Sequence, residues 1–338
     1  MRRFNIQLVI RTFAHTYTFT PHSSLLMGNI GSYLAQSFPP SSKFKVEDIP
    51  DLTGWIIVVT GGNTGIGYEI IKVVLSKNAK VYMATRSRAK AIAAIAKLKT
   101  ETGGKEAIFL ELDLSDLTSV RHAANEFKQK EDRLHVLFNN GGVMNTPIER
   151  LTADNYDLQF GTNVIGHYVL FKQLLVPLLA SVQSSEVKKA RIVNMSSSAQ
   201  MFIDTIHFET IKDTPERKDL GSAKLYMQSK LANVVLSNEI GRRYGPEGLV
   251  SISLNPGNIK TDLQRSTPAA FMLLFGWLFS PASFGALTPL YAGVSNASED
   301  LNSTYLIPWA RVSKMRSEAS DVVLGQRLWK WLEDETKD

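Results

Sequence analysis

The stretch Thr60-Gly61-Gly62-Asn63-Thr64-Gly65-Ile66-Gly67 decides the fold of this chain. An apolar, β-branched run at residues 55–60 leads into it, and an apolar pattern with helical spacing follows it. Glycines allow positive φ angles and a close approach of the backbone, so the turn and the helix N-terminus behind it can hold a pyrophosphate through N–H groups. A glycine cluster can also be only a tight turn, but its place between the first strand and the first helix favours dinucleotide binding.

Beyond this turn, short apolar runs alternate with stretches long enough for helices. We predict strands at residues 55–60, 81–85, 107–111, 136–138, 191–195, 250–254 and 305–307, and helices at 65–77, 89–100, 117–130, 162–180 and 223–243. The alternation predicts an α/β fold: a single Rossmann-type, doubly wound parallel sheet of about seven strands with helices on both faces. In such a sheet the ligand binds at the carboxyl ends of the strands.

Composition excludes several kinds of site. The chain has 338 residues and no cysteine, so it forms no disulfide, zinc-thiolate site or iron–sulfur cluster. Its six histidines lie far apart, with no pair at metal-ligand spacing, and we predict no metal site. We place a single dinucleotide-binding domain at residues 47–338, after an N-terminal extension at residues 1–46.

The positive charge is concentrated in that extension. Residues 1–46 contain five basic residues and no acid, so they carry +5 of the net charge of +6. A nearly neutral body argues against nucleic-acid binding. The basic tail fits a mitochondrial transit peptide. An equally good interpretation is that translation starts at Met27, and residues 1–26 are then not part of the protein. We expect a cytoplasmic protein, or a mitochondrial one if residues 1–26 are genuine.

A long apolar run lies at residues 269–279. Its eleven residues are too few to span a bilayer, so we predict no transmembrane helix. The run can be a buried helix, an apolar lid over a substrate pocket or a peripheral contact with a membrane surface, and the first two are favoured. A lid of this composition would select a lipophilic substrate.

The end of the second predicted strand indicates which cofactor is bound. An NAD-binding fold carries an acid here for the ribose hydroxyls, whereas this chain has Thr85-Arg86-Ser87-Arg88. A guanidinium at Arg86 suits the 2′-phosphate of NADP. The pattern therefore favours NADP(H) over NAD(H), although surface arginines are common and only the position supports this inference.

Tyr226 and Lys230 indicate acid/base chemistry. Their four-residue spacing places both side chains on one face of the predicted helix. A fixed ammonium favours the phenolate and moves the pKa of the phenol toward that of a working general acid/base. This spacing alone also occurs on ordinary solvated helix faces, so the pair depends on its context.

That context is a series of motifs in a fixed order. They are Asp113-Leu114, Asn139-Asn140-Gly141-Gly142, Gly161-Thr162-Asn163-Val164, Ser196-Ser197-Ser198 and Pro256-Gly257-Asn258-Ile259-Lys260-Thr261. With the glycine turn and the Tyr226/Lys230 pair, they resemble the short-chain dehydrogenase/reductase family over residues 50–310. Ile206-His207-Phe208 and Tyr305-Leu306-Ile307-Pro308-Trp309 are similar to fungal retinol dehydrogenase-like and WW-domain oxidoreductase-like members.

The resemblance implies a role for each matched residue. The catalytic residues would be Asn163, Ser197, Tyr226 and Lys230. Besides Arg86, the cofactor would contact Gly61, Asn63, Gly65, Ile66, Gly67, Asp113, Leu114, Asn140, Gly141, Tyr226, Lys230, Pro256, Ile259 and Thr261. Gly141 replaces the alanine that is usual in the family, and the serine triplet leaves a one-residue ambiguity. The neighbouring serines are expected to be structural, and His167 to pack rather than act as a base.

The implied activity is hydride transfer between NADP(H) and a carbonyl or alcohol of a small, lipophilic molecule, with Tyr226 as the general acid/base. Substrate identity does not follow, because the substrate segment at about residues 263–290 diverges most in the family. The family often pairs subunits through the helices that hold Asn163 and Tyr226, so a homodimer or homotetramer is plausible. The alternative is a catalytically silent NADP-binding sensor or scaffold. An epimerase or dehydratase is disfavoured by the Gly-x-x-x-Gly-x-Gly spacing and the short C-terminal part.

Overall fold

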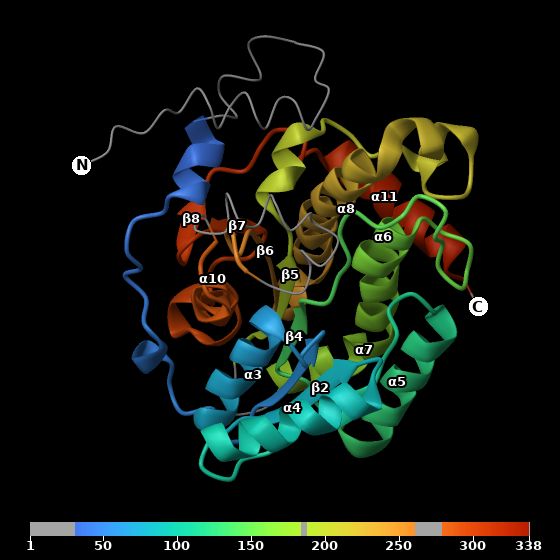
Figure 1. The fold of residues 1–338 in the computed structure, drawn as a ribbon. Helices are drawn as coiled ribbons and strands as arrows, with labels where there is room; N and C mark the ends of the chain where they lie inside the picture. The colour runs from blue at the N-terminus through green and yellow to red at the C-terminus, as the bar shows by residue number, and fades with distance from the viewer. Residues whose placement is uncertain (1–30, 184–187, 261–278, 338) are drawn as a thin grey trace.

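The sheet is the centre of the molecule (Figure 1). Within residues 31–183, 188–260 and 279–337, which the computed structural model of the protein describes, eight strands pair in the order β3-β2-β1-β4-β5-β6-β7-β8. They are β1 (Ile56–Thr60), β2 (Lys80–Thr85), β3 (Ile108–Glu111), β4 (Val136–Asn139), β5 (Ala190–Met195), β6 (Leu249–Leu254), β7 (Thr304–Ile307) and β8 (Arg311–Ser313). The predicted α/β fold and the seven predicted strands are confirmed.

The eighth strand was not predicted. β8 has three residues, pairs antiparallel with β7, and leaves Val312 57% exposed at the edge of the sheet. Such a short strand has no apolar run to mark it in the sequence. The other pairings are parallel, and β1 lies between β2 and β4. The chain order reverses there, so the carboxyl ends of β1 and β4 form the topological switch point at which ligands of such sheets bind.

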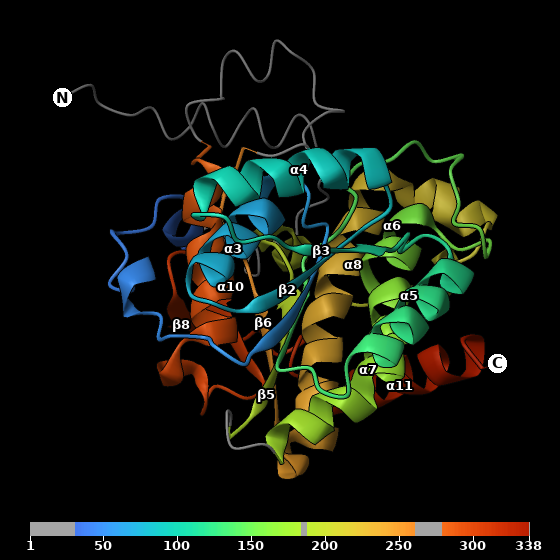
Figure 2. The same cartoon turned by 90° about the horizontal axis from the view of Figure 1, so that it is seen from below.

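Helices cover both faces of the sheet (Figure 2). The described helices are α3 (Gly65–Ser76), α4 (Arg88–Glu101), α5 (Leu117–Lys130), α6 (Leu158–Phe160), α7 (Gly166–Val182), α8 (Pro215–Tyr244), α10 (Ala282–Val294) and α11 (Val322–Glu335). Short helical turns are η1 (Val46–Asp48), η2 (Gly161–Ile165), η3 (Ser198–Phe202), η4 (Phe208–Thr210), η5 (Gly245–Glu247) and η8 (Asn296–Ser298). One apolar core joins the sheet to α3, α4 and α10, and the other joins it to α5, α7, α8 and α11.

Two helices depart from their predicted form. The stretch predicted as one helix at 162–180 instead starts with α6, continues through the π-helical turn η2 and becomes α7. The helix predicted at 223–243 starts eight residues earlier, at Pro215, and bends at Gly221, whose φ is 78°. Leu158–Val182 is also long and apolar enough to cross a membrane, but 67% of its most apolar window is buried in the protein, as in a core helix.

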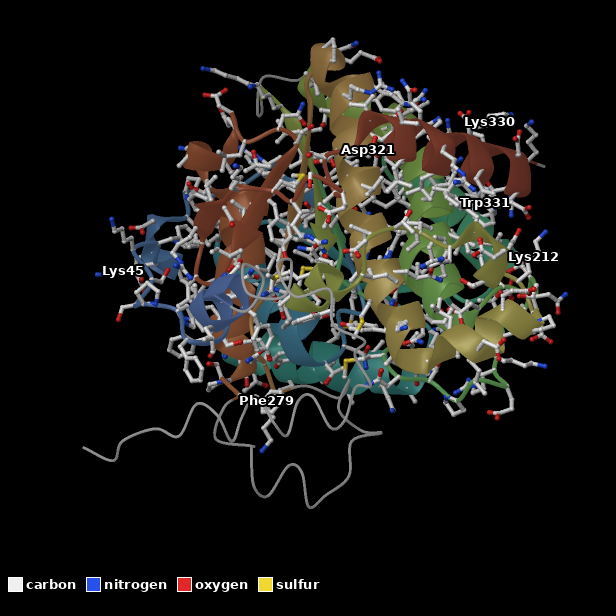
Figure 3. All side chains as sticks on the ribbon, turned by 90° about the horizontal axis from the view of Figure 1, so that it is seen from above. Lys45, Lys212, Phe279, Asp321, Lys330 and Trp331 are labelled. Carbon is white, nitrogen blue, oxygen red and sulfur yellow. The ribbon has the colours of Figure 1, made fainter. Side chains whose placement is uncertain are left out.

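Helix α11 covers the outer sides of α7 and α8. Trp329 is 1% exposed and packs edge-on against Tyr168 of α7, with their ring centroids 5.4 Å apart, while Arg243 of α8 lies over its indole. Figure 3 shows Trp331 of the same helix on the side of the molecule where Lys212 also lies. A dimer formed through α7 and α8 would therefore have to accommodate α11.

Part of the predicted N-terminal extension packs onto the domain. Residues 31–37 are helical, and Gln36 is 3% exposed. Its amide accepts a hydrogen bond from Asn255 Nδ2 (2.8 Å) and donates one to Met201 Sδ (3.3 Å). Phe44 is also buried, with its ring against Tyr291. Residues 31–46 thus contact elements that flank the predicted catalytic residues.

Candidate active site

The glycine-rich turn after β1 has the shape expected of a phosphate-binding turn. Gly61 and Gly65 have φ angles of 64° and 57°. A Cβ added to Gly67 would lie 2.5 Å from Gly61 O and 2.6 Å from Asn140 Nδ2, so only glycine fits at this position. Helix α3 starts at Gly65, and the side chain of its N-cap residue, Thr64, makes no capping hydrogen bond. The N–H groups at the N-terminus of a helix suit a pyrophosphate, so this turn fits a dinucleotide.

Thr60 joins this turn to the one after β4. Its Oγ1 accepts hydrogen bonds from Asn140 N (2.9 Å) and Gly141 N (2.8 Å). Asn140 Nδ2 in turn donates to Thr60 O at 2.8 Å. A Cβ on Gly141 would lie 3.0 Å from Leu114 Cδ1 and 3.3 Å from Gly61 N, which is tight. The glycine in place of the family's alanine therefore relieves a crowded contact between the two turns.

The predicted adenosine end gathers at the carboxyl ends of β2 and β3. Arg86 follows β2 directly and is exposed, and it makes no ion pair with any residue that the structure describes. Thr85 Oγ1 donates to Asn63 Oδ1 (2.8 Å), which holds the glycine turn against β2. Asp113 accepts from Ser115 N and Oγ, and Leu114 is 8% exposed. The predicted adenosine-end residues therefore share one edge of the sheet.

Asn163 lies in the middle of η2 and is fully buried. Its Oδ1 accepts from Val143 N (2.9 Å), and its Nδ2 is 3.0 Å from both Val143 O and Ser229 Oγ. The π-helical turn widens the backbone there, so the chain between α6 and α7 departs from a regular α-helix. Position 142 faces both Asn163 and Lys230, because a Cβ there would lie 2.9 Å from Asn163 Oδ1 and 3.8 Å from Lys230 Nζ.

The three serines after β5 are in different environments. Ser196 Oγ donates to Lys230 O (2.7 Å) and is buried. Ser198 is 8% exposed and starts η3, whereas Ser197 is half-buried and caps that turn through a bond from Ala199 N. Ser197 is thus the least buried serine of the triplet at the end of β5.

Lys230 lies at the same strand end. Its Nζ donates to Met195 O (3.0 Å) and is 5.7 Å from the centroid of the Tyr226 ring. Burial lowers the pKa of Lys230 to about 8, so its ammonium form still predominates at neutral pH. Tyr226 is half-buried one helical turn earlier, so the predicted pair does share one face of α8.

The segment after β6 completes the site. Gly257 has a φ of 95°, and a Cβ there would lie 3.1 Å from Trp309. Ile259 is 4% exposed and meets Ile66 at Gly285 of α10, where a Cβ would lie within 3.0 Å of both side chains. Thr261, residues 269–278 of the predicted apolar run at 269–279, and most of the predicted substrate segment lie outside the described residues.

Several residues of the site were not predicted. Thr60 and His167 bond to the predicted site residues Gly141 and Asn163. Asn255 Oδ1 accepts from Gly257 N, and Gln36 bonds to Asn255. Arg217 is 1% exposed and binds Asp157 (3.2 Å) and the carbonyls of Ile148 and Arg150, so it holds the loop in front of η2. Neither a motif nor a spacing identifies Gln36, Arg217 or Asn255, because their partners are distant in the sequence.

Residues 55–207 match the short chain dehydrogenase family. A short-chain dehydrogenase/reductase of Armillaria gallica is 53% identical over 313 residues, which cover 92% of this chain and 100% of that protein. Retinol dehydrogenase 11 of Homo sapiens is 35% identical over 282 residues, 82% of this chain and 84% of that protein.

Two solved structures show the same fold. One is a protein from Mycobacterium paratuberculosis that is described as uncharacterized. It is 28% identical to this chain, with a TM-score of 0.68, and the match covers 87% of this chain and 98% of the other chain. A short chain dehydrogenase from Burkholderia cenocepacia in complex with NADP is 24% identical, with a TM-score of 0.60, over 77% and 98% of the two chains.

Members of the family bind a nicotinamide cofactor, which agrees with the glycine turn at the switch point of this sheet. Identity at half of the aligned positions, over the full length of a relative, leaves no doubt about descent. This chain belongs to the short-chain dehydrogenase/reductase family of oxidoreductases.

Proposed function

We propose that the protein is an NADP(H)-dependent oxidoreductase that interconverts a carbonyl and an alcohol on a lipophilic small molecule. One observation carries this proposal: a buried ammonium, Lys230 Nζ, lies one helical turn from a half-buried phenol, Tyr226, at the carboxyl end of β5. A buried cation beside an accessible phenol is an arrangement for proton transfer, since it stabilises the phenolate.

Each catalytic group has a task that its environment supports. When bound, the nicotinamide cofactor supplies or accepts the hydride. Tyr226 donates its phenolic proton to the carbonyl oxygen during reduction and takes it back during oxidation. Ser197 Oγ donates a hydrogen bond to the same oxygen, where negative charge develops in the transition state. Lys230 holds the positive charge that favours the Tyr226 phenolate, and Asn163 is fixed beside it by Val143 and Ser229.

The preference for NADP(H) is supported by the end of β2. Arg86 is exposed there and free of ion pairs with other described residues, so its guanidinium is available to a 2′-phosphate. Arg88 differs, because it lies over the Phe109 ring at 5.0 Å. Thr85 is occupied by Asn63, and no carboxylate follows the strand directly to bind ribose hydroxyls.

A lipophilic substrate is supported by aromatic side chains beside the segment after β6. The Trp309 ring packs against Gly257 and is 5.6 Å from the ring of Phe284, which is 47% exposed. A relative at 35% identity is named for retinol, a lipophilic alcohol. An apolar wall at this place would favour an apolar ligand over a sugar, because it offers few hydrogen-bond partners.

The test is oxidation of NADPH and of NADH by purified protein with lipophilic ketones and aldehydes, and with hydrophilic sugars as the contrasting set. We expect turnover with NADPH and a lipophilic carbonyl, and a loss of about 10²–10⁴-fold in kcat for Tyr226→Phe. Activity on sugars alone would refute the lipophilic substrate. Tight NADPH binding without turnover on any carbonyl would favour the alternative function, a silent NADP-binding sensor or scaffold.

A further inference from the structure

His167 connects two parts of the site that are far apart in the sequence. It lies in the first turn of α7, four residues after Asn163, and is 4% exposed. Its Nδ1 is 3.1 Å from Asn163 O, and its Nε2 is 2.9 Å from Thr60 Oγ1. Thr60 ends β1, so the ring bridges the π-helical turn and the start of the glycine-rich turn.

The hydrogen-bond partners determine the state of the ring. A main-chain carbonyl only accepts hydrogen bonds, so Nδ1 carries the proton that is donated to Asn163 O. A neutral ring then has a lone pair on Nε2, which accepts the hydroxyl proton of Thr60. Burial lowers the pKa of His167 to about 4, in agreement with a neutral ring at neutral pH.

This bond directs the hydroxyl of Thr60. With its proton donated to His167, Thr60 Oγ1 has both lone pairs available for Asn140 N–H and Gly141 N–H, which it binds at 2.9 and 2.8 Å. Without His167 the hydroxyl proton has another acceptor in Phe138 O, at the longer distance of 3.3 Å. Turning the proton toward Phe138 would disturb the bonds that hold the turn after β4.

We propose that His167 is a positioning residue that couples the π-helical turn carrying Asn163 to the two cofactor-binding turns through Thr60. The inference rests on the proposed function and extends it. His167 acts as a neutral bridge with one donor and one acceptor. It is no proton donor or base for substrate, since both ring nitrogens are engaged inside the protein and the side chain is buried.

The chain offers variants that isolate this bridge. His167→Phe keeps a ring and removes both hydrogen bonds, whereas His167→Gln keeps one donor and one acceptor on a single amide. Thr60→Val removes the other end of the bridge with little change in shape. Tyr168→Phe is the matched control, because Tyr168 is the next residue of α7, is 1% exposed, and has a hydroxyl without a hydrogen-bond partner among the described residues.

The experiment is a double-mutant cycle read in three ways: the Kd for NADPH by fluorescence titration, kcat, and the thermal midpoint. We expect His167→Phe to weaken NADPH binding and to lower kcat, each about tenfold, because the bond to Thr60, which transmits the effect to the turns, is worth about that factor. His167→Gln should recover most of both losses. The double variant His167→Phe/Thr60→Val should be no worse than the poorer single variant, since both break the same bridge.

Several outcomes would overturn the coupling. These are strictly additive effects of the two substitutions, a lower thermal midpoint with unchanged Kd and kcat, or an equal loss in Tyr168→Phe. The Kd does not require turnover, so the cycle decides the role of His167 even if no carbonyl proves to be a substrate. If His167→Phe fails to fold, comparing His167→Gln and Thr60→Val with the control still decides whether NADPH affinity follows the bridge.

Discussion

The cofactor end and the catalytic end of this site are built in different ways. Residues 60–67 and 140–141 meet through closely packed glycines, where a Cβ on Gly67 would collide with Gly61 O, and through the side chains of Thr60 and Asn140, which bond to main-chain groups. The loop and helices around Asn163 are held instead by a network of buried side chains. Arg217 binds Asp157 and two carbonyls, while Gln159 donates to Ser222 O at 2.8 Å.

The difference has consequences for substitution. A turn shaped by glycines tolerates almost no added atom but depends on few partners, so changes there should act on cofactor binding. A loop held by a buried network depends on every member of the network, because a group left without its partner stays buried and desolvated. Apart from His167, which bridges to Thr60, changes there should act on stability or on kcat and leave cofactor affinity alone.

The largest expected effect is on stability, from Arg217→Met. Arg217 and Asp157 are 1% exposed each, and removing the cation leaves a buried carboxylate unpaired. We expect the free energy of unfolding to fall by about 3–5 kcal/mol in urea denaturation, with an unchanged Kd for NADPH in the folded protein. Lys218→Met, at an exposed neighbour, is the control and should change stability by less than about 0.5 kcal/mol. A loss of cofactor affinity in Arg217→Met would erase the contrast between the two ends.

Ser197→Ala should act on chemistry alone. Losing one hydrogen-bond donor to a developing oxyanion lowers kcat by about 10²–10³-fold, equivalent to roughly 3–4 kcal/mol, while the Kd for NADPH stays the same. Ser198→Ala, at the buried neighbour that starts η3, is the matched control with activity near wild type. If Ser198→Ala loses the activity instead, the catalytic serine has been assigned one residue too early.

The pH dependence of stability should expose the buried imidazole. His167 has a pKa of about 4 in the folded protein against an ordinary value of 6.5, so the unfolded chain binds the proton first as pH falls. Its contribution to stability is complete above pH 6.5 and is lost as pH falls to about 4, by roughly 3 kcal/mol. The unfolding free energy of wild type and of His167→Gln is measured by urea titration at each pH. The difference between the two isolates the pH dependence that is due to His167 from that of the carboxylates, which both proteins share. A difference that does not change with pH would contradict the prediction.

Gly67→Ala should act on the cofactor end. The added Cβ would push both Gly61 O and Asn140 Nδ2 away from position 67. Overpacking of this kind costs about 1–3 kcal/mol of stability. We expect NADPH affinity to fall about 10- to 100-fold by fluorescence titration, with kcat at saturating cofactor little changed. Gly31→Ala is the control, since no neighbouring atom of the described residues lies within 4 Å of its added Cβ. A variant with normal affinity and reduced kcat would mean that the two ends are not separable.

Arg86→Gln should have the smallest effect and the most selective one. Loss of the guanidinium removes a charged hydrogen bond to a 2′-phosphate. The ratio of kcat/KM for NADPH to kcat/KM for NADH should therefore fall about tenfold, while turnover with NADH is retained. Arg88→Gln, whose guanidinium lies over Phe109, should leave the ratio unchanged. An unchanged ratio in Arg86→Gln, or a changed one in Arg88→Gln, would assign the preference elsewhere.

Much of the fold was predictable because its signals are local. A buried parallel strand has to be an apolar run and a phosphate turn has to contain glycine, so β1 to β7 and the turn after β1 were found from residue type and spacing. β8 was missed because an exposed edge strand of three residues needs neither an apolar run nor a glycine. The π-helical turn at Asn163 was predicted as ordinary helix, because a single turn of five residues is too short to change the apolar pattern of the helix around it.

By itself, the sequence determined the α/β class, the order of the elements and the residue types at the carboxyl ends of the strands, since these follow from hydrophobic period, glycine content and the spacing of Tyr226 and Lys230. Only the tertiary structure decided which distant side chains meet, such as His167 with Thr60, Arg217 with Asp157 and Gln36 with Asn255. These contacts join residues from 60 to 219 positions apart. A hydrogen bond of that kind is specific in three dimensions and leaves no periodic mark along the chain.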